Sequence, residues 1–460
     1  MKTFSHPIAS VFAALFALVL HAGGAVANPY ETTLDNGLKV VVKEDHRAPV
    51  VTQMLWYRVG SMDEVDGHSG LAHMLEHMMF KGTPKVGAGE FSKRVAAAGG
   101  RDNAFTSSDY TAYFQQVPRE KLAEMMELEA DRMRHLNTDP KEFAQELKVV
   151  MEERRMRTED NPHALLSEQL HAVAFQAHPY RRPVIGWMND LENMSAQEAQ
   201  DWHKSWYAPN NATLVVSGDV AHEEVFRLAR RYYGSLRART LPGRKPQREP
   251  EQKGVRRLVT KGPAELPYVL LTWKTPGIEK IDGPSEPYAL EMLAAILDGH
   301  DAARLSRSLV REQRLATSAG ASYSALNRGP SLFYLYATPV PGQDVETLEK
   351  ALRAEVGRIA QEGVTEAELK RAKAQLIASR VYKLDSVFGQ AMEIGMLEIQ
   401  GFAYRDLAAI EARLEAISAK EIQRAAQTWF GDDTLTAGIL EPIPVQRADS
   451  GDNGADGSNP

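Results

Sequence analysis

The most informative absence in this sequence of 460 residues is cysteine, which occurs at no position. Without cysteine the chain can form neither a disulfide nor a thiolate metal site, so any metal would need histidine or carboxylate ligands. An excess of positive charge is missing too, because the formal net charge is −7. This balance gives no general attraction to nucleic acid or anionic lipid, and we expect no nucleic-acid partner.

Long apolar runs are confined to the first 27 residues. There Lys2 supplies a weakly positive start, residues 8–20 form an apolar stretch, and residues 25–27 read Ala-Val-Ala, a small-residue cleavage pattern. The segment predicts a signal peptide at 1–27, with an N-terminal membrane anchor as the alternative. We therefore expect an exported protein in a bacterial periplasm, with no stable membrane span in the rest of the chain.

The remaining chain has the composition of a globular protein, with 43% hydrophobic and 25% charged residues. Strand-like and helical stretches follow a similar order in two halves, and a stretch rich in proline, glycine and charge separates them. This predicts an α+β fold with two related α/β-sandwich-like domains, at 28–235 and 255–446. Residues 236–254 are expected to form a solvated linker, and 447–460 a disordered tail.

One apolar helical stretch carries a polar stripe. In GHSGLAHMLEHMMFKGTP, residues 67–84, His73, Glu76 and His77 follow the order H-x-x-E-H. At ~100° per residue these side chains share one helix face, and leucines and methionines occupy the other. Two imidazoles at i and i+4 can reach one zinc ion, and a carboxylate beside them can take a proton from water on the metal. Taken alone, the pattern fits equally well a helix with two surface histidines and a glutamate between them.

A catalytic zinc site usually has a third protein ligand. The segment FAQELKVVMEERRMR at 143–157 offers Glu146, Glu152 and Glu153. On a helix, Glu146 and Glu153 share a face with valines, whereas Glu152 points away. Carboxylates held among apolar side chains need a partner, which a metal and its histidines would supply. A charged helix that faces solvent is the alternative.

These segments resemble those of the M16 metallopeptidases, the family of pitrilysin, insulysin and mitochondrial processing peptidase, and its short bacterial members most of all. GLAHMLEHMMFKGT resembles the zinc motif, VVMEERR the third-ligand segment, and GGRDNAFTSSDYTAY and WYAPNNATLVVSGDV two further signatures. The resemblance implies that His73, His77 and Glu153 bind one zinc ion (Zn2+) per chain. It also implies that Glu76 is the general base and that Glu146 supports a histidine ligand. Manganese and cobalt are alternatives to zinc, because nitrogen–oxygen sites bind several of these ions.

The resemblance further implies a substrate strand. Asn103, Ala104 and Phe105 match the edge strand on which the family lays its peptide. An extended peptide can pair with such an edge through main-chain hydrogen bonds, largely independently of its sequence. Asn103 would then hold the scissile region near the metal. A plain hairpin strand is the alternative.

One departure concerns a family motif in the later half, similar to LREKRGLAY, whose arginine and tyrosine help to bind the substrate carbonyl. The matching segment VREQRLATS at 310–318 keeps Arg311 but has Thr317 where the tyrosine is expected. A threonine hydroxyl is too short to replace a phenol that reaches across a cavity. The family closes two halves around its peptide, and this chain resembles one half of such a clamshell. We therefore expect a heterodimer with a second M16-like subunit that supplies an intact pair; a homodimer is the alternative.

The function implied is that of a zinc-dependent endopeptidase that hydrolyses peptides or unfolded polypeptides in a closed chamber, with Glu76 activating the water on zinc. The rival prediction is a non-catalytic M16-like subunit that binds peptides or scaffolds a partner. The intact H-x-x-E-H set favours the enzyme, and the altered VREQRLATS segment favours the rival.

Overall fold

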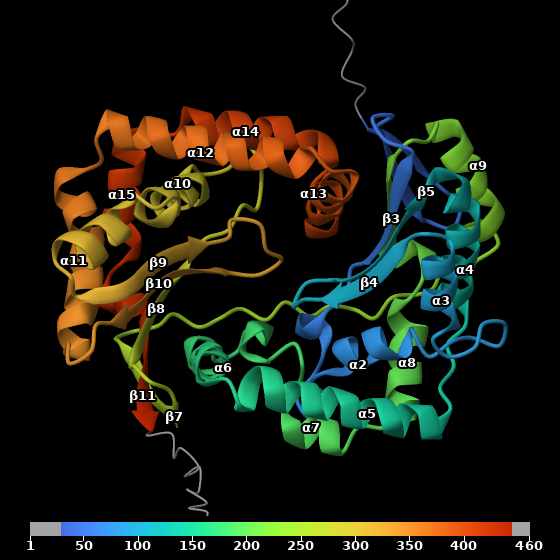
Figure 1. The fold of residues 1–460 in the computed structure, drawn as a ribbon, viewed down its shortest axis with the longest axis horizontal. Helices are drawn as coiled ribbons and strands as arrows, with labels where there is room; N and C mark the ends of the chain where they lie inside the picture. The colour runs from blue at the N-terminus through green and yellow to red at the C-terminus, as the bar shows by residue number, and fades with distance from the viewer. Residues whose placement is uncertain (1–28, 444–460) are drawn as a thin grey trace, which may run out of the picture.

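The computed structural model describes residues 29–443, which form two β-sheets flanked by helices (Figure 1). The predicted signal peptide at 1–27 and tail at 447–460 lie outside the described residues. In the described range, no helix has both the length and the hydropathy that crossing a membrane requires. The α+β class expected from the sequence is confirmed.

The first sheet has six strands in the order β1-β2-β6-β3-β5-β4. In that order they are β1 (Tyr30–Thr33), β2 (Lys39–Glu44), β6 (Ala212–Gly218), β3 (Val50–Tyr57), β5 (Thr111–Pro118) and β4 (Arg101–Thr106). β2 and β6 run parallel, and the other neighbouring pairs are antiparallel. Because β4 pairs only with β5, it is an edge strand of this sheet.

The second sheet repeats this topology. Its order is β7-β11-β8-β10-β9, with strands β7 (Arg256–Pro263), β11 (Leu435–Ile443), β8 (Tyr268–Thr275), β10 (Ser331–Pro339) and β9 (Ala316–Tyr323). Once β1 is set aside, both sheets place the last strand of the set second in order, parallel to the first strand. The structural repeat suggested by the sequence is therefore confirmed.

Helices cover both sheets. Those before the linker are α2 (Leu71–Met78), α3 (Glu90–Ala97), α4 (Leu122–Arg134), α5 (Pro140–Arg154), α6 (Pro162–Ala174), α7 (Met188–Glu192), α8 (Ala196–Trp206) and α9 (His222–Tyr233). Those after it are α10 (Glu286–Asp298), α11 (Val345–Glu362), α12 (Glu366–Leu384), α13 (Val387–Gln400), α14 (Leu407–Ala416) and α15 (Ala419–Trp429). At the start of α8, Ser195 and Glu198 form a capping box, which satisfies main-chain N–H groups of the first turn.

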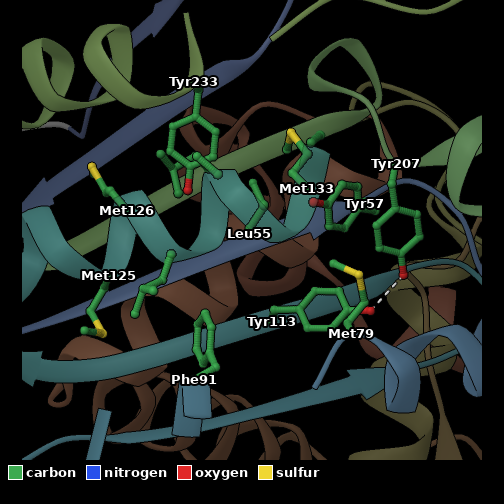
Figure 2. Packing of buried hydrophobic residues seen from close by; sticks show 14 of the residues in the cluster. Leu55, Tyr57, Met79, Phe91, Tyr113, Met125, Met126, Met133, Tyr207 and Tyr233 are labelled. Carbon is green, nitrogen blue, oxygen red and sulfur yellow. Dashed lines mark hydrogen bonds between the residues drawn. The ribbon is translucent and has the colours of Figure 1, made fainter. Parts of the chain in front are cut away.

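The core of the first half joins the sheet to α4 and to α2. Figure 2 shows Met125, Met126 and Met133 of α4 in the same buried cluster as Tyr113, whose hydroxyl lies 2.8 Å from that of Tyr207. The apolar face of α2 enters the same cluster, with its buried residues Leu71, Met74, Leu75 and Met78. Burial of that face holds the opposite, polar face of α2 toward β4.

Two helices exchange between the halves, an arrangement that periodicity along the chain does not predict. α6 precedes the linker but packs on β7 and β11, with Leu166 and Leu170 against Leu270 and Leu440. α13 follows the linker but covers β3 and β6 of the first sheet, where Ile394 joins the cluster of Trp56. The two halves are therefore interlocked by apolar packing (Figure 1).

The linker predicted at 236–254 contains no helix or strand, as expected, but it is tied to its surroundings. The Glu249 carboxylate accepts main-chain N–H groups from Gln176, Ala177 and His178 and pairs with Lys274 Nζ at 3.0 Å. A single linker side chain thus contacts both the segment after α6 and strand β8.

Candidate metal centre and active site

The helix that carries H-x-x-E-H is held firmly at its N-terminus. The Glu64 carboxylate accepts hydrogen bonds from the Gly70 and Ala72 amides at 3.0 and 2.8 Å. Gly70 has a φ of +90°, and a Cβ there would lie 2.7 Å from the carbonyl oxygen of Ile185. Capping and close backbone packing therefore fix where α2 begins.

The three predicted metal ligands lie close together in the structure. His77 Nε2 lies 3.2 Å and His73 Nε2 3.8 Å from the same carboxylate oxygen, Oε2 of Glu153. The two histidines stand on successive turns of α2, and Glu153 stands in the last turn of α5. A π-helical turn, η3 (Arg155–Glu159), follows α5 directly and begins two residues after Glu153. Such turns are frequent at functional sites.

Electrostatics keep the two imidazoles in different states. Burial, together with the nearby charges of His77 and Arg157, lowers the pKa of His73 to about 3. Burial also opposes protonation of His77, but the hydrogen bond to Glu146, at 2.8 Å from Nδ1, and the charge of Glu153 raise its pKa overall. Glu146 thus contacts His77, and Lys81 Nζ pairs with the other Glu146 oxygen at 2.5 Å.

Glu76 lies on the same face of α2 but makes a separate contact. Its Oε2 accepts a hydrogen bond from the hydroxyl of Thr106, the last residue of β4. Burial raises the pKa of Glu76, although the bond from Thr106 and the charge of His77 oppose the shift. A raised pKa makes the Glu76 carboxylate a stronger base than an exposed glutamate.

The predicted substrate strand lines the same cavity as the metal cluster, a space of about 750 Å³ that includes His73, Glu76, His77 and Glu153. Because side chains alternate along a strand, Ala104 shares the face of Thr106, toward α2. Asn103 and Phe105 belong to the other face, where Phe105 packs edge-to-face on Trp56. The main-chain edge of the strand therefore faces the cavity, while the Phe105 side chain packs in the core between the sheet and α13.

Arg311 is not brought to this cavity, whose described lining comes entirely from the first half. It lies in the π-helical turn η6 (Ser306–Glu312), where its guanidinium donates to the carbonyl oxygen of Asp301 at 2.6 Å. Thr317 is exposed and donates to the carbonyl oxygen of Thr338. A substrate-binding role for Arg311 stays a prediction that would need a second subunit.

Sequence reasoning missed four residues that hold the site: Glu64, Lys81, Thr106 and Arg157. Arg157 pairs with Glu153 at 2.6 Å and stands four residues after it, a helical spacing that could have been recognised. Thr106 stands two residues after Ala104 in the predicted strand, so period-two alternation would have placed both on one face. Glu64 could not be found this way, because no fixed spacing links a loop carboxylate to the helix it caps.

The residues present fit a zinc ion. His73, His77 and Glu153 each offer one ligand atom, and these atoms all lie within 4.8 Å of one another. The set of two imidazoles and one carboxylate is a ligand set of catalytic zinc. His73 Nδ1 is buried without a hydrogen-bond partner in the described chain, and a neutral ring of this kind is the metal-binding form.

A second group with metal-ligand spacing occurs among residues 29–443, formed by Glu44, His222 and Glu223. It lies outside the cavity, and its members already pair with one another. Glu44 Oε1 accepts a hydrogen bond from the main-chain N–H of His222 and lies 2.8 Å from Nδ1 of the same residue. This pairing is explained by the start of α9, so the group gives no reason to assign a metal.

Comparison with known proteins places the chain in a family. A model described as insulinase, peptidase family M16, matches residues 39–187, and one described as peptidase M16 inactive domain matches 193–376. A protein of Helicobacter pylori named zinc protease PqqE is 32% identical over 443 residues, which cover 95% of this chain and 98% of that protein. The chain belongs to peptidase family M16.

Solved structures agree with this M16 assignment. The crystal structure of a protease from Helicobacter pylori matches with a TM-score of 0.85 and 32% identity, over 90% of this chain and all of that one. The periplasmic protease PqqL from Escherichia coli has the same fold, with a TM-score of 0.77 at 19% identity. The match covers 91% of this M16 chain but 48% of the PqqL chain, so PqqL is about twice as long.

Proposed function

We propose that this M16 chain is a zinc-dependent endopeptidase that hydrolyses extended peptides or unfolded polypeptides. The observation that carries the proposal is one cavity that holds His73, His77 and Glu153, the base Glu76, and the unpaired edge of β4. When bound, zinc would supply a positive charge that acidifies water and polarises a peptide carbonyl. The names of the relatives, zinc proteases, support the choice of metal.

The chain's own residues would supply the remaining chemistry. Main-chain groups of β4 would pair with an extended peptide, and folded substrates would be excluded because their strands are already paired. Glu76 would take one proton from the attacking water as the new C–O bond forms. As the C–N bond breaks, Glu76 would return that proton to the leaving nitrogen, while Thr106 keeps the carboxylate in place.

The test compares wild type with Glu76→Gln, using a quenched library of unstructured peptides and a measured zinc content for each protein. We expect both proteins to hold one zinc per chain and the variant to lose about 10²–10⁴-fold in cleavage rate, the usual contribution of a general base. Glu152→Gln is the matched control, since Glu152 lies on the same helix as Glu153 but is exposed and pairs with Arg155. Equal cleavage by Glu76→Gln and wild type would contradict the mechanism.

The rival function is a non-catalytic subunit, favoured by the position of Arg311 and Thr317 away from the cavity. The same experiment, repeated with a candidate M16-like partner added, separates the two, because a binding subunit would hold zinc and bind peptides but cut none under either condition. We propose that the chain forms a dimer with a second M16-like subunit. The double length of PqqL, in which two such halves would be fused, supports this proposal. Full peptidase activity of the chain alone, as a monomer, would contradict the dimer.

Export to a bacterial periplasm is proposed from the N-terminal 27 residues and is supported by the periplasmic location named for PqqL. Fractionation of cells that express the full chain tests it, and a mature N-terminus near Asn28 is the expected result.

A further inference from the structure

A second cavity of about 480 Å³ adjoins the metal-site cavity. Three side chains line both spaces: Ser108, His171 and Tyr180. The second cavity lies between the turn that follows β4, the end of α6, the β9–β10 loop and the end of α13. Figure 1 shows the β9–β10 loop extending from the second sheet toward the first. Both halves of the chain therefore build this cavity, whereas the metal-site cavity is built by the first half.

Half of the side chains in the wall are apolar or aromatic, and the other half are polar. The apolar and aromatic side chains include Phe175, Tyr323, Leu326, Leu332, Tyr334 and Met396. A concave site with aromatic rings among polar groups suits a flat aromatic side chain, which can pack against those rings.

One polar group of the wall lacks a partner. Gln400 is 9% exposed, and its Nε2 donates to Asp109 at 3.1 Å. Its Oε1 is buried and accepts no hydrogen bond from the described part of the chain. A buried acceptor without a donor is costly, so a small movement of the Gln400 side chain that lets Oε1 accept an N–H group from a peptide backbone would be favourable.

The wall is held in place by buried charges that cross between the halves. Arg328, in the β9–β10 loop, donates two hydrogen bonds to Asp63 at 2.9 and 3.1 Å, and both side chains are almost fully buried. The Arg328 amide donates to Asp109 at 3.0 Å, and the Tyr180 hydroxyl donates to the other Asp109 oxygen. The loop is therefore fixed against the turn that follows β4, so the cavity is a preformed feature of the fold.

The path of the substrate strand connects the two spaces. β4 ends at Thr106, whose hydroxyl contacts Glu76, and the second cavity begins at the next residue, Ser107. An extended peptide paired with β4 that continues past Thr106 would pass Ser108 and Tyr180 into the second cavity.

We propose that this second cavity is a specificity subsite that takes an apolar, preferentially aromatic, side chain of the peptide bound along β4, with Gln400 accepting one of its main-chain N–H groups. The proposal rests on the proposed peptidase function and adds a substrate preference, set in part by the second half of the chain.

The experiment measures peptide binding separately from cleavage. The probes are fluorescent unstructured peptides of serine, glycine and alanine in which a single phenylalanine is moved along the sequence. Binding is followed by fluorescence anisotropy on the zinc-loaded Glu76→Gln protein, which should not cut them. Ser322→Trp fills the cavity, because Ser322 is exposed on β9 and lines it. Ser318→Trp is the matched control, since Ser318 is exposed on the same strand and lines neither cavity.

We expect phenylalanine at one position to tighten binding by about tenfold over the peptide without it, the scale of burying part of one aromatic side chain. Ser322→Trp should abolish that gain and Ser318→Trp should keep it. Leu326→Ala, which removes part of the apolar wall, should reduce the gain in a protein whose thermal unfolding shows that it is folded. Equal effects of the two tryptophan variants, or no position at which phenylalanine tightens binding, would overturn the subsite. Cleavage of the same peptides by wild type tests the peptidase function independently.

Discussion

At the scale of single residues, the metal cluster depends on carboxylates that come from a different helix. Glu146 and Glu153 stand on α5, two turns apart, and each contacts an imidazole of α2. Glu153 offers its oxygen as a ligand atom, whereas Glu146 contacts Nδ1 of His77 and so leaves Nε2 directed at the site. Helical periodicity placed these two glutamates on one face of α5, where the structure has them, and their contacts assign them different roles.

This difference predicts the effect of Glu146→Gln. The neutral amide would hold the His77 ring more weakly, so we expect zinc affinity to fall by about 10–100-fold, the usual effect of losing such a supporting carboxylate. Competition with a chelator of known affinity measures the change. Glu152→Gln, on the exposed side of the same helix, should bind zinc as wild type does. If the two variants bind zinc equally, Glu146 does not orient the ligand.

At the scale of elements, the position of α2 is decided by what packs at its first turn. Gly70 and Gly186 approach each other so closely that a Cβ on Gly70 would lie 3.0 Å from the Cα of Gly186. Gly67 has a similar positive φ, +85°, but a Cβ there would meet nothing within 4 Å. Comparing Gly67 with Gly70 therefore distinguishes the cost of a left-handed backbone alone from the cost of that backbone together with close packing.

Substitution by alanine should expose that difference. Gly67→Ala should lower the free energy of unfolding by about 1 kcal/mol, the cost of a left-handed backbone for a residue with a Cβ. Gly70→Ala should cost roughly 1–3 kcal/mol more, because the added methyl group would displace the 185–186 backbone and the start of α2. Urea unfolding measures both values. Equal losses in the two variants would show that close packing at Gly70 contributes nothing.

At the scale of the whole molecule, three features join the two halves: the exchanged helices α6 and α13, the buried pair of Arg328 and Asp63, and Glu249 in the linker.

The contacts of Glu249 make the stability of the protein depend on pH. Burial opposes its ionisation, but the three main-chain N–H groups and Lys274 prevail and lower its pKa to about 2. The unfolded chain would titrate this group near 4.5, so its stabilising effect is complete above that pH and is lost as pH falls from 4.5 toward 2.

Glu249→Gln should therefore weaken the fall in the free energy of unfolding that accompanies a fall in pH. At pH 7 we expect a loss of about 1–3 kcal/mol in the free energy of unfolding, the scale of hydrogen bonds to a charged acceptor. Between pH 5 and 2 the variant should lose less stability than wild type does, as measured by urea unfolding across that range. Glu251→Gln is the control, because Glu251 lies in the same linker but is 82% exposed. Parallel acid limbs for wild type and Glu249→Gln would contradict the assignment.

The sequence by itself determined the local parts of this protein: the face of α2 that carries His73, Glu76 and His77, the pairing of Glu146 with Glu153, the strand nature of 103–105, and the repeat of two halves. Each follows from periodicity or from a family motif, which involve neighbours along the chain. Only the tertiary structure decided that Thr106 holds Glu76, that Glu64 caps α2, that α6 and α13 change sides, and that both halves share a cavity beside the metal site. Except for the cap by Glu64, these contacts join residues far apart in the chain, and they arise because apolar faces must be buried and buried charges must be paired, wherever the fold provides a partner.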